Sequence, residues 1–191
     1  MTITTLTPPS GEPLSLADAK AFARVGGNHD DTLISQLISA ARARVEQATG
    51  LALMPRSLRL TLSEWPLGVL DRGGLALPHR PAHELIAVRI TDGVTEDDVT
   101  SSLELDPSLA AGLRLAPGKG WPWPRSVHER IEIDWQAGFP ALEDIPDDLI
   151  HALKLIVAHE FENRDASDYR AQDRLQDRLR EVLMPWMERR I

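Results

Sequence analysis

Cysteine is absent from the 191-residue sequence. Without thiols, the chain forms no disulfide bonds and offers no thiolate as a metal ligand or a nucleophile. The absence excludes cysteine-dependent chemistry and fits a protein that folds in a reducing compartment.

Long hydrophobic runs are absent as well. The longest, LIHALKLIVA at residues 149–158, has about half the length of a membrane-spanning helix and includes His151 and Lys154. The first residues, MTITTLTPPSGEP, lack the basic patch and apolar core of a signal peptide. We therefore predict a soluble protein that is made inside the cell.

The sequence also lacks an excess of positive charge. Its formal net charge is −8 and its pI is near 5.2, with 42% hydrophobic and 26% charged residues. This composition is typical of a globular protein, and its charge gives no long-range attraction to nucleic acid or to an anionic membrane. The length predicts a single domain over residues 1–191.

Helices are predicted at both ends of the chain. Ser15 stands three residues before Asp18 as an N-cap, and a second helix runs from Asp30 or Asp31 to Gly50 with one apolar stripe. Near the C-terminus, Pro146 suits the first helical position of a helix that runs to about residue 164. A last amphipathic stretch covers roughly residues 168–190 and is interrupted by Pro185.

Between the helices, the hydrophobic period changes to two. SLRLTLSEW, ELIAVRITDG and ERIEIDW alternate apolar and polar residues, and shorter strands are predicted around residues 103–105 and 113–115. Short, turn-punctuated strands favour antiparallel pairing. We predict an α+β fold: a mainly helical core of about four helices, over residues 14–50 and 145–190, with an inserted antiparallel strand-rich region over residues 56–136.

One helix resembles a zinc-protease motif. His159 and Glu160 open an H-E-x-x-H pattern, in which two imidazoles four residues apart hold Zn²⁺ and the Glu activates water. Asn163 stands at the second His position, and a neutral amide is a poor zinc ligand. The alternatives are a degenerate metal site and a core helix that contains a chance His-Glu pair.

Other motifs are weaker. PGKG at residues 117–120 lacks the remaining residues of a phosphate-binding loop, so a tight turn is predicted. TEDDV at residues 95–99 lacks the Gly and the distant Glu of a calcium loop, so a solvated turn is predicted. Trp121 and Trp123 alternate with prolines and are predicted to cover the sheet or to meet a partner. Residues 1–13 and APGKGWPWPRS resemble linkers.

The order of these features resembles the head-tail connector, or adaptor, proteins of long-tailed bacteriophages and gene transfer agents. The similar stretches are LTPPSGEPLSLADAKAFARV, DDTLISQLISAARARVEQATGLAL, GWPWPRSVHERIEIDWQAGF, IPDDLIHALKLIVAHEFENRD and LMPWMERRI. In this family the helix before the C-terminal segment carries a motif that matches His159, Phe161, Glu162, Asn163 and Arg164. Glu160 departs from the family pattern and must find a donor, reach water or become protonated.

The resemblance implies a structural function without a cofactor or catalytic residues. Roughly a dozen copies would form a ring on the portal protein, extend the DNA conduit and join the next tail or stopper component. The protein would be made in the bacterial cytoplasm and incorporated at the head-tail junction of a phage or phage-like particle. The acidic balance suits a conduit, because a wall that attracted phosphates strongly would hold the passing DNA.

The C-terminal segment is the predicted portal contact. Residues 164–191 carry seven Arg against six acidic residues, so this end is nearly neutral. Trp186 and Met187 would act as apolar anchors, and Arg189 and Arg190 would pair with carboxylates. The alternative is that Trp186 covers the protein's own core. The rival functions are a degenerate H-E-x-x-N metal hydrolase and a nucleic-acid-binding accessory protein.

Overall fold

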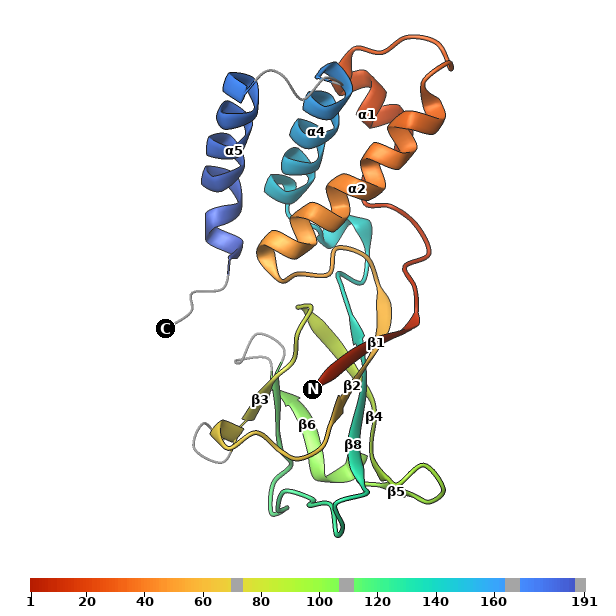
Figure 1. The fold of residues 1–191 in the computed structure, drawn as a ribbon, viewed down its shortest axis with the longest axis vertical. Coiled ribbons are helices and arrows are strands. Elements are labelled where there is room, and N and C mark those ends of the chain that lie inside the picture. The colour runs from red at the N-terminus through yellow and green to blue at the C-terminus, as the bar shows by residue number, and fades with distance from the viewer. Residues whose placement is uncertain (70–73, 107–111, 164–168, 188–191) are drawn as a thin grey trace. The chain divides into compact units, whose positions relative to one another are not determined.

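The computed structural model describes residues 1–69, 74–106, 112–163 and 169–187 (Figure 1). The chain forms two compact units. The strand-rich unit consists of Met1–Ser10 and Pro55–Pro140, and the helical unit consists of Gly11–Met54 and Ala141–Ile191. The α+β prediction is confirmed, because helices and antiparallel sheets occupy separate stretches of the sequence. The prediction of one domain stays a prediction.

The first half of the helical unit holds α1 (Leu16–Ala23) and α2 (Asp31–Thr49). The predicted N-cap is present, since the Ser15 hydroxyl accepts a 3.0 Å hydrogen bond from the Asp18 amide. Arg24 ends α1 and Gly50 ends α2, both in the left-handed region, with φ of 55° and 69°. The glycine suits this conformation because it has no Cβ.

The second half of the helical unit holds α4 (Asp147–Glu162) and α5 (Tyr169–Leu183). The 3-10 turns η3 (Leu142–Asp144) and η4 (Met184–Trp186) precede α4 and follow α5. Pro146 is the N-cap of α4 and not its first helical residue, which corrects the predicted start by one position. Pro185 lies within η4, where the α-helix has ended.

The core of the helical unit forms where α4 packs between its neighbours. Figure 1 shows α4 beside α2 and α5, which both contact it, and α1 contacts it as well. Each helix buries one apolar stripe. The buried apolar side chains of these helices are Ala19 of α1; Ile34, Ile38, Ala41 and Val45 of α2; Leu149, Ala152, Leu153, Ile156 and Val157 of α4; and Leu175, Leu179 and Leu183 of α5. The described helices include none that is long and apolar enough to span a bilayer.

The strand-rich unit contains a five-stranded antiparallel sheet with the strand order β1-β2-β8-β4-β5. Its strands are β1 (Thr2–Thr7), β2 (Arg56–Leu62), β8 (Arg130–Ala137), β4 (Ala82–Thr91) and β5 (Glu96–Asp98). A second sheet, in the order β3-β7-β6, is formed by β3 (Gly74–Ala76), β7 (Gly112–Leu115) and β6 (Leu103–Asp106), which follows η1 (Thr100–Ser102).

The alternating pattern of the sequence sets the register of the large sheet. Leu60 of β2 lies opposite Ile133 of β8, which lies opposite Val88 of β4, and all three are buried. The neighbouring rows pair Leu58 with Trp135 and Leu62 with Ile131. The apolar residues therefore share one face of the sheet, as a period of two requires.

Three features differ from the sequence prediction. β1 lies where a linker was expected, and β5 lies within the acidic run that was expected to be a solvated turn. The alternation in ELIAVRITDG predicts that Ile86 shares a face with Val88 and Ile90, but Ile86 is 42% exposed, whereas the other two are buried. A register shift between Leu85 and Ala87 explains this, because an extra residue in a strand reverses the facing of its side chain.

The loops before β8 confirm the predicted turn at PGKG. The Lys119 amide donates to the carbonyl of Ala116 over 3.1 Å, and Gly118 has a φ of 75°. Trp121 packs against Trp65 with a 4.8 Å centroid distance, so it covers the core, whereas Trp123 is 50% exposed.

Candidate functional site

The C-terminal end of α4 carries the zinc-like pattern. The Asn163 backbone amide donates to the His159 carbonyl over 2.9 Å, and its side-chain amide donates to the same oxygen over 3.0 Å. Asn163 therefore satisfies a carbonyl that the end of the helix would leave unpaired. The residue at the expected second-ligand position has a structural role here.

Glu160 lies outside the apolar core of α4. Its side chain is 45% exposed and forms a 3.3 Å ion pair with Arg44 of α2. Helical periodicity predicts that Glu160 projects from the middle of the apolar face of α4, and this prediction is wrong, because the carboxylate reaches both water and a donor. The buried stripe of α4 ends at Val157, one turn before Glu160.

The described residues contain no group of three or more His, Asp or Glu side chains that could hold a metal ion. A zinc site needs at least three protein ligands in a tetrahedral arrangement. Within the described part of the chain, the metal-hydrolase alternative therefore gains no support from the geometry.

Three residues of the family motif, His159, Glu162 and Asn163, line a polar groove between α4 and α5. Phe161 is half-buried and Glu162 is exposed, while Arg164 lies outside the described residues. The groove has a volume of about 460 Å³, and its lining combines an imidazole, a carboxylate and two guanidinium groups. The polar lining residues are His159, Glu162, Asn163, Arg174 and Arg178.

A second groove lies between α2, α4 and α5, on the other flank of α5, and is mostly apolar. Its volume is about 420 Å³, and Arg44 and Arg180 bring positive charge to its lining. The apolar lining residues are Ala48, Ile156, Leu179, Leu183, Met184 and Met187. The helical period places Ala48 on the apolar stripe predicted for α2, but Ala48 is exposed beside this groove. We call this the methionine groove.

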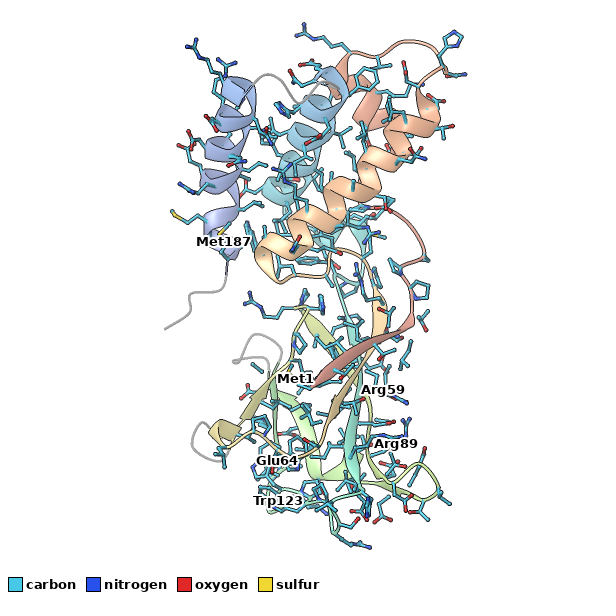
Figure 2. All side chains as sticks on the ribbon, viewed as in Figure 1. Met1, Arg59, Glu64, Arg89, Trp123 and Met187 are labelled. Carbon is cyan, nitrogen blue, oxygen red and sulfur yellow. The ribbon has the colours of Figure 1, made fainter. Side chains whose placement is uncertain are left out.

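The C-terminal segment leaves its methionines exposed. Met184 is 67% exposed and Met187 is 38% exposed, and Figure 2 labels Met187 just after the end of α5. Trp186 is half-buried, and its buried indole N–H has no acceptor among the described residues. An unpaired buried donor costs about 1–3 kcal/mol, so Trp186 is poorly satisfied where it lies. Arg189 and Arg190 lie outside the described residues.

The sequence prediction named Met187 but missed Met184. Three leucines on one face bury α5 against its neighbours, so the predicted stripe is confirmed and α5 itself belongs to the core. Met184 directly precedes Pro185, and the change to a 3-10 turn carries it out of that stripe. The position of the proline was the signal in the sequence that could have identified it.

The polar face of the large sheet carries a buried charge network in the strand-rich unit. Asp134 of β8 accepts hydrogen bonds from Arg59 at 2.7 and 2.8 Å and from Arg89 at 2.9 Å. Arg59 also pairs with Glu132 at 2.8 Å. Figure 2 shows Arg59 and Arg89 on the same side of the sheet. Burial alone would raise the pKa of Asp134, but the hydrogen bonds and charges of these arginines hold it below its ordinary value.

Comparisons with known proteins agree with this structure along the whole chain. Residues 13–102 match the model of the phage gp6-like head-tail connector protein family. Two solved structures, described as the neck of an empty gene transfer agent (GTA) particle computed with C6 symmetry and the virion of a native GTA particle, are 26% and 27% identical, with TM-scores of 0.81 and 0.83. A third, the neck of a native GTA particle computed with C12 symmetry, is 26% identical with a TM-score of 0.77.

Each of these matches covers 100% of this chain and 97% of the other chain. No curated protein matches the sequence. The neck structures indicate a place in the neck of a particle and a ring assembly, and the matches imply a structural role. The metal-hydrolase and nucleic-acid-binding alternatives find no support among the matches. The family match and the whole-length similarity to GTA neck proteins confirm the resemblance to head-tail connectors and support a structural connector at the head-tail junction.

Proposed function

We propose that this chain forms a ring of roughly a dozen copies on the portal protein, where it extends the DNA conduit and receives the next tail or stopper component. The whole-length similarity to neck structures computed with C6 and C12 symmetry is the observation that carries the proposal. Cyclic symmetry requires head-to-tail contacts between copies, and these close into a ring. The formal net charge of −8 supports a conduit that does not hold DNA.

The portal contact lies on the helical unit in this proposal. The methionine groove, with Met184 and Met187 exposed at its border, offers a flexible apolar surface that can adapt to a partner helix. Arg44 and Arg180 supply positive charge that can pair with carboxylates on the portal. Trp186 remains a candidate anchor because its indole N–H needs an acceptor.

Two charge substitutions test this contact. The variant Met184→Glu/Met187→Glu should keep its helical circular dichroism, because both side chains are exposed, and should lose at least about tenfold in affinity for the portal protein. Val127→Glu is the matched control, since Val127 is 95% exposed and lies in the strand-rich unit. Unchanged portal binding by the double variant would show that the groove is not the contact.

Deletion of residues 185–191 tests whether Trp186 docks on the portal or packs against the protein's own core. A truncated protein that stays folded but no longer binds the portal supports the docking role. A truncated protein that loses stability while it still binds the portal shows that Trp186 serves the protein's own core.

A further inference from the structure

The two outer strands of the five-stranded sheet differ in length and charge. β5 has only three residues, Glu96–Asp98, and all three are acidic and exposed. A short, charged outer strand is one of the ways in which proteins prevent a sheet from pairing with another chain. β1 has six residues, Thr2–Thr7, with the uncharged sequence TITTLT. It carries no charge, proline or glycine that would discourage pairing.

β1 is also exposed on both of its faces. All six side chains are exposed, including Ile3 at 38% and Leu6 at 44%. β2 is the only described strand that pairs with β1, so the outer row of backbone N–H and C=O groups has no backbone partner within the described chain. A long, uncharged strand with an open row of donors and acceptors favours addition of a further strand.

A second open row lies on β4. β5 pairs with β4 only at Arg89–Thr91. At Val88, the backbone carbonyl accepts a hydrogen bond from the Val99 amide, and the backbone amide donates to the Thr100 hydroxyl. Residues 82–87 pair with β8 on one side. β6 also contacts β4, but no described backbone group forms a hydrogen bond with residues 82–87 on the side away from β8. We call these residues the open β4 segment. Its six residues equal β1 in length, and His83, Glu84 and Ile86 are exposed.

The strand directions fit a head-to-tail contact between copies. Because β1, β2, β8 and β4 are successively antiparallel, β1 runs antiparallel to β4. Rotation from one copy to the next in a ring of roughly a dozen copies turns a strand by about 30° at most, so β1 of one copy meets β4 of the next in the antiparallel sense. Pairing β1 with the next β5 would be parallel and only three residues long. Pairing β1 with β1 would close a two-fold dimer instead of a ring.

The facing of the side chains fixes a register. Thr4 lies opposite Arg59 and Glu84 lies opposite Gln136, so both belong to the polar face of the sheet. Setting Thr4 opposite Glu84 then places Ile3 opposite Leu85, which are both on the apolar face. A shift by one residue would set apolar against polar positions.

We propose that β1 of one copy adds to the open β4 segment of the next, with Thr4 opposite Glu84, so that one antiparallel sheet continues around the ring. The proposal rests on the ring proposed above and names its subunit contact. The occupant is a second copy of this chain, because the same sheet supplies both rows with matching length and direction. Their facing matches at Glu84 and Leu85, which lie between the two register shifts of the open β4 segment.

Engineered disulfides test the contact directly, since the natural chain has no cysteine. Directly opposed residues of antiparallel strands have Cβ atoms about 4.5–5.5 Å apart, which is near enough for a disulfide after a small adjustment. Thr4→Cys/Glu84→Cys is oxidised mildly, at high concentration and on the portal. We expect a ladder of covalently linked chains on a denaturing gel, and no ladder from either single variant.

Native mass spectrometry of the same samples distinguishes a failure of the strand pairing from a failure of ring formation. A ring without a ladder would overturn the strand pairing and leave the proposed function standing. Linked dimers from Thr4→Cys alone would show β1–β1 pairing and overturn the proposal. Absence of any ring, at high concentration and on the portal, would overturn both proposals together.

A charge on β1 gives an independent measurement that needs no oxidation. Thr4→Lys adds a lysine to an exposed position of an outer strand, which is a common way to prevent pairing. We expect the folded monomer to persist and the concentration needed for ring assembly to rise at least about tenfold. Val94→Lys is the control, since Val94 is 91% exposed in the loop between β4 and β5. Equal assembly by both variants would contradict the proposal.

Discussion

The helical unit and the strand-rich unit present different kinds of contact surface. The helical unit offers side chains, namely the methionine groove with Met184 and Met187 exposed beside it. The strand-rich unit offers rows of backbone N–H and C=O groups along β1 and the open β4 segment. Side chains select a partner by shape and charge, whereas backbone rows suit strands of matching length and direction. In our proposals, the first surface carries the portal contact and the second carries the contact between identical copies.

The units also differ in how they use charge. The strand-rich unit buries Asp134 and Glu132 beneath arginines on a face that alternation alone would assign to solvent. The helical unit is held mainly by leucine, isoleucine and alanine stripes. Damage to one unit should therefore be measurable with little effect on the other, and four of the five tryptophans lie in the strand-rich unit while Trp186 lies in the helical unit.

The largest expected effect comes from Asp134→Asn. The side chain of Asp134 is 3% exposed and paired with Arg59 and Arg89, so loss of its charge removes the carboxylate that two partly buried guanidinium groups share. We expect a loss of about 3–5 kcal/mol in the free energy of unfolding, measured by urea titration with tryptophan fluorescence. The control, Asp97→Asn, removes an exposed ion pair with Arg125 and should cost about 0–1 kcal/mol. Equal losses in the two variants would show that the network does not stabilise the sheet.

The same carboxylate gives the strand-rich unit an acid-sensitive contribution. The pKa of Asp134 is lower in the folded protein than the value of about 3.9 in an unfolded chain. Its contribution to stability is therefore complete above that unfolded value and is lost as the pH falls through the folded pKa. The Asp134→Asn variant should show a weaker loss of stability than the natural protein between about pH 5 and pH 2. Parallel acid curves would contradict this assignment.

The next largest effect is expected from Leu153→Ala in the helical unit. Leu153 of α4 is completely buried, so truncation leaves a cavity and should cost about 2–5 kcal/mol. Circular dichroism at the helical minimum should report this loss, while fluorescence from the strand-rich unit should change less. Leu142→Ala is the control, because Leu142 is 52% exposed, and it should stay within about 0.5 kcal/mol. Equal shifts of both signals would show that the two units unfold as one.

The smallest effect is expected from Glu160→Gln. Its ion pair with Arg44 joins side chains that are 45% and 40% exposed, so solvent screens the interaction. We expect a loss of about 0–1 kcal/mol and unchanged metal content, measured by thermal unfolding and elemental analysis. One equivalent of bound zinc that disappears in His159→Ala would reverse the structural interpretation of this helix.

The hydrophobic periodicity of the sequence predicted the helices and strands that bury one face and expose the other to solvent. α2 with Ile34 and Ile38, and β8 with Ile131 and Ile133, show such patterns and were found within a residue or two. β1 could not be found in this way, because both of its faces are exposed and its sequence shows no burial pattern. The open row of β1 exists only through pairing with β2, which lies about fifty residues later in the sequence.

The candidate site was predictable only in part for similar reasons. Met187 was identified because it follows Pro185, but the groove beside it needs Ala48 of α2 and Ile156 of α4, which are distant in sequence. Glu160 looked buried on a helical wheel, yet the packing of α4 ends one turn earlier. Asp134 looked solvent-facing, yet arginines from β2 and β4 cover it. In each case the outcome depends on a neighbour that local sequence does not specify.

Negative-stain imaging of the natural protein mixed with its portal protein tests the central claim most directly. The account predicts closed rings of roughly a dozen copies stacked on one end of the portal. We also expect Met184→Glu/Met187→Glu to remove the rings from the portal, and Thr4→Lys to raise the concentration needed for ring closure at least about tenfold. A stable dimer that buries α4 and never joins the portal would contradict it.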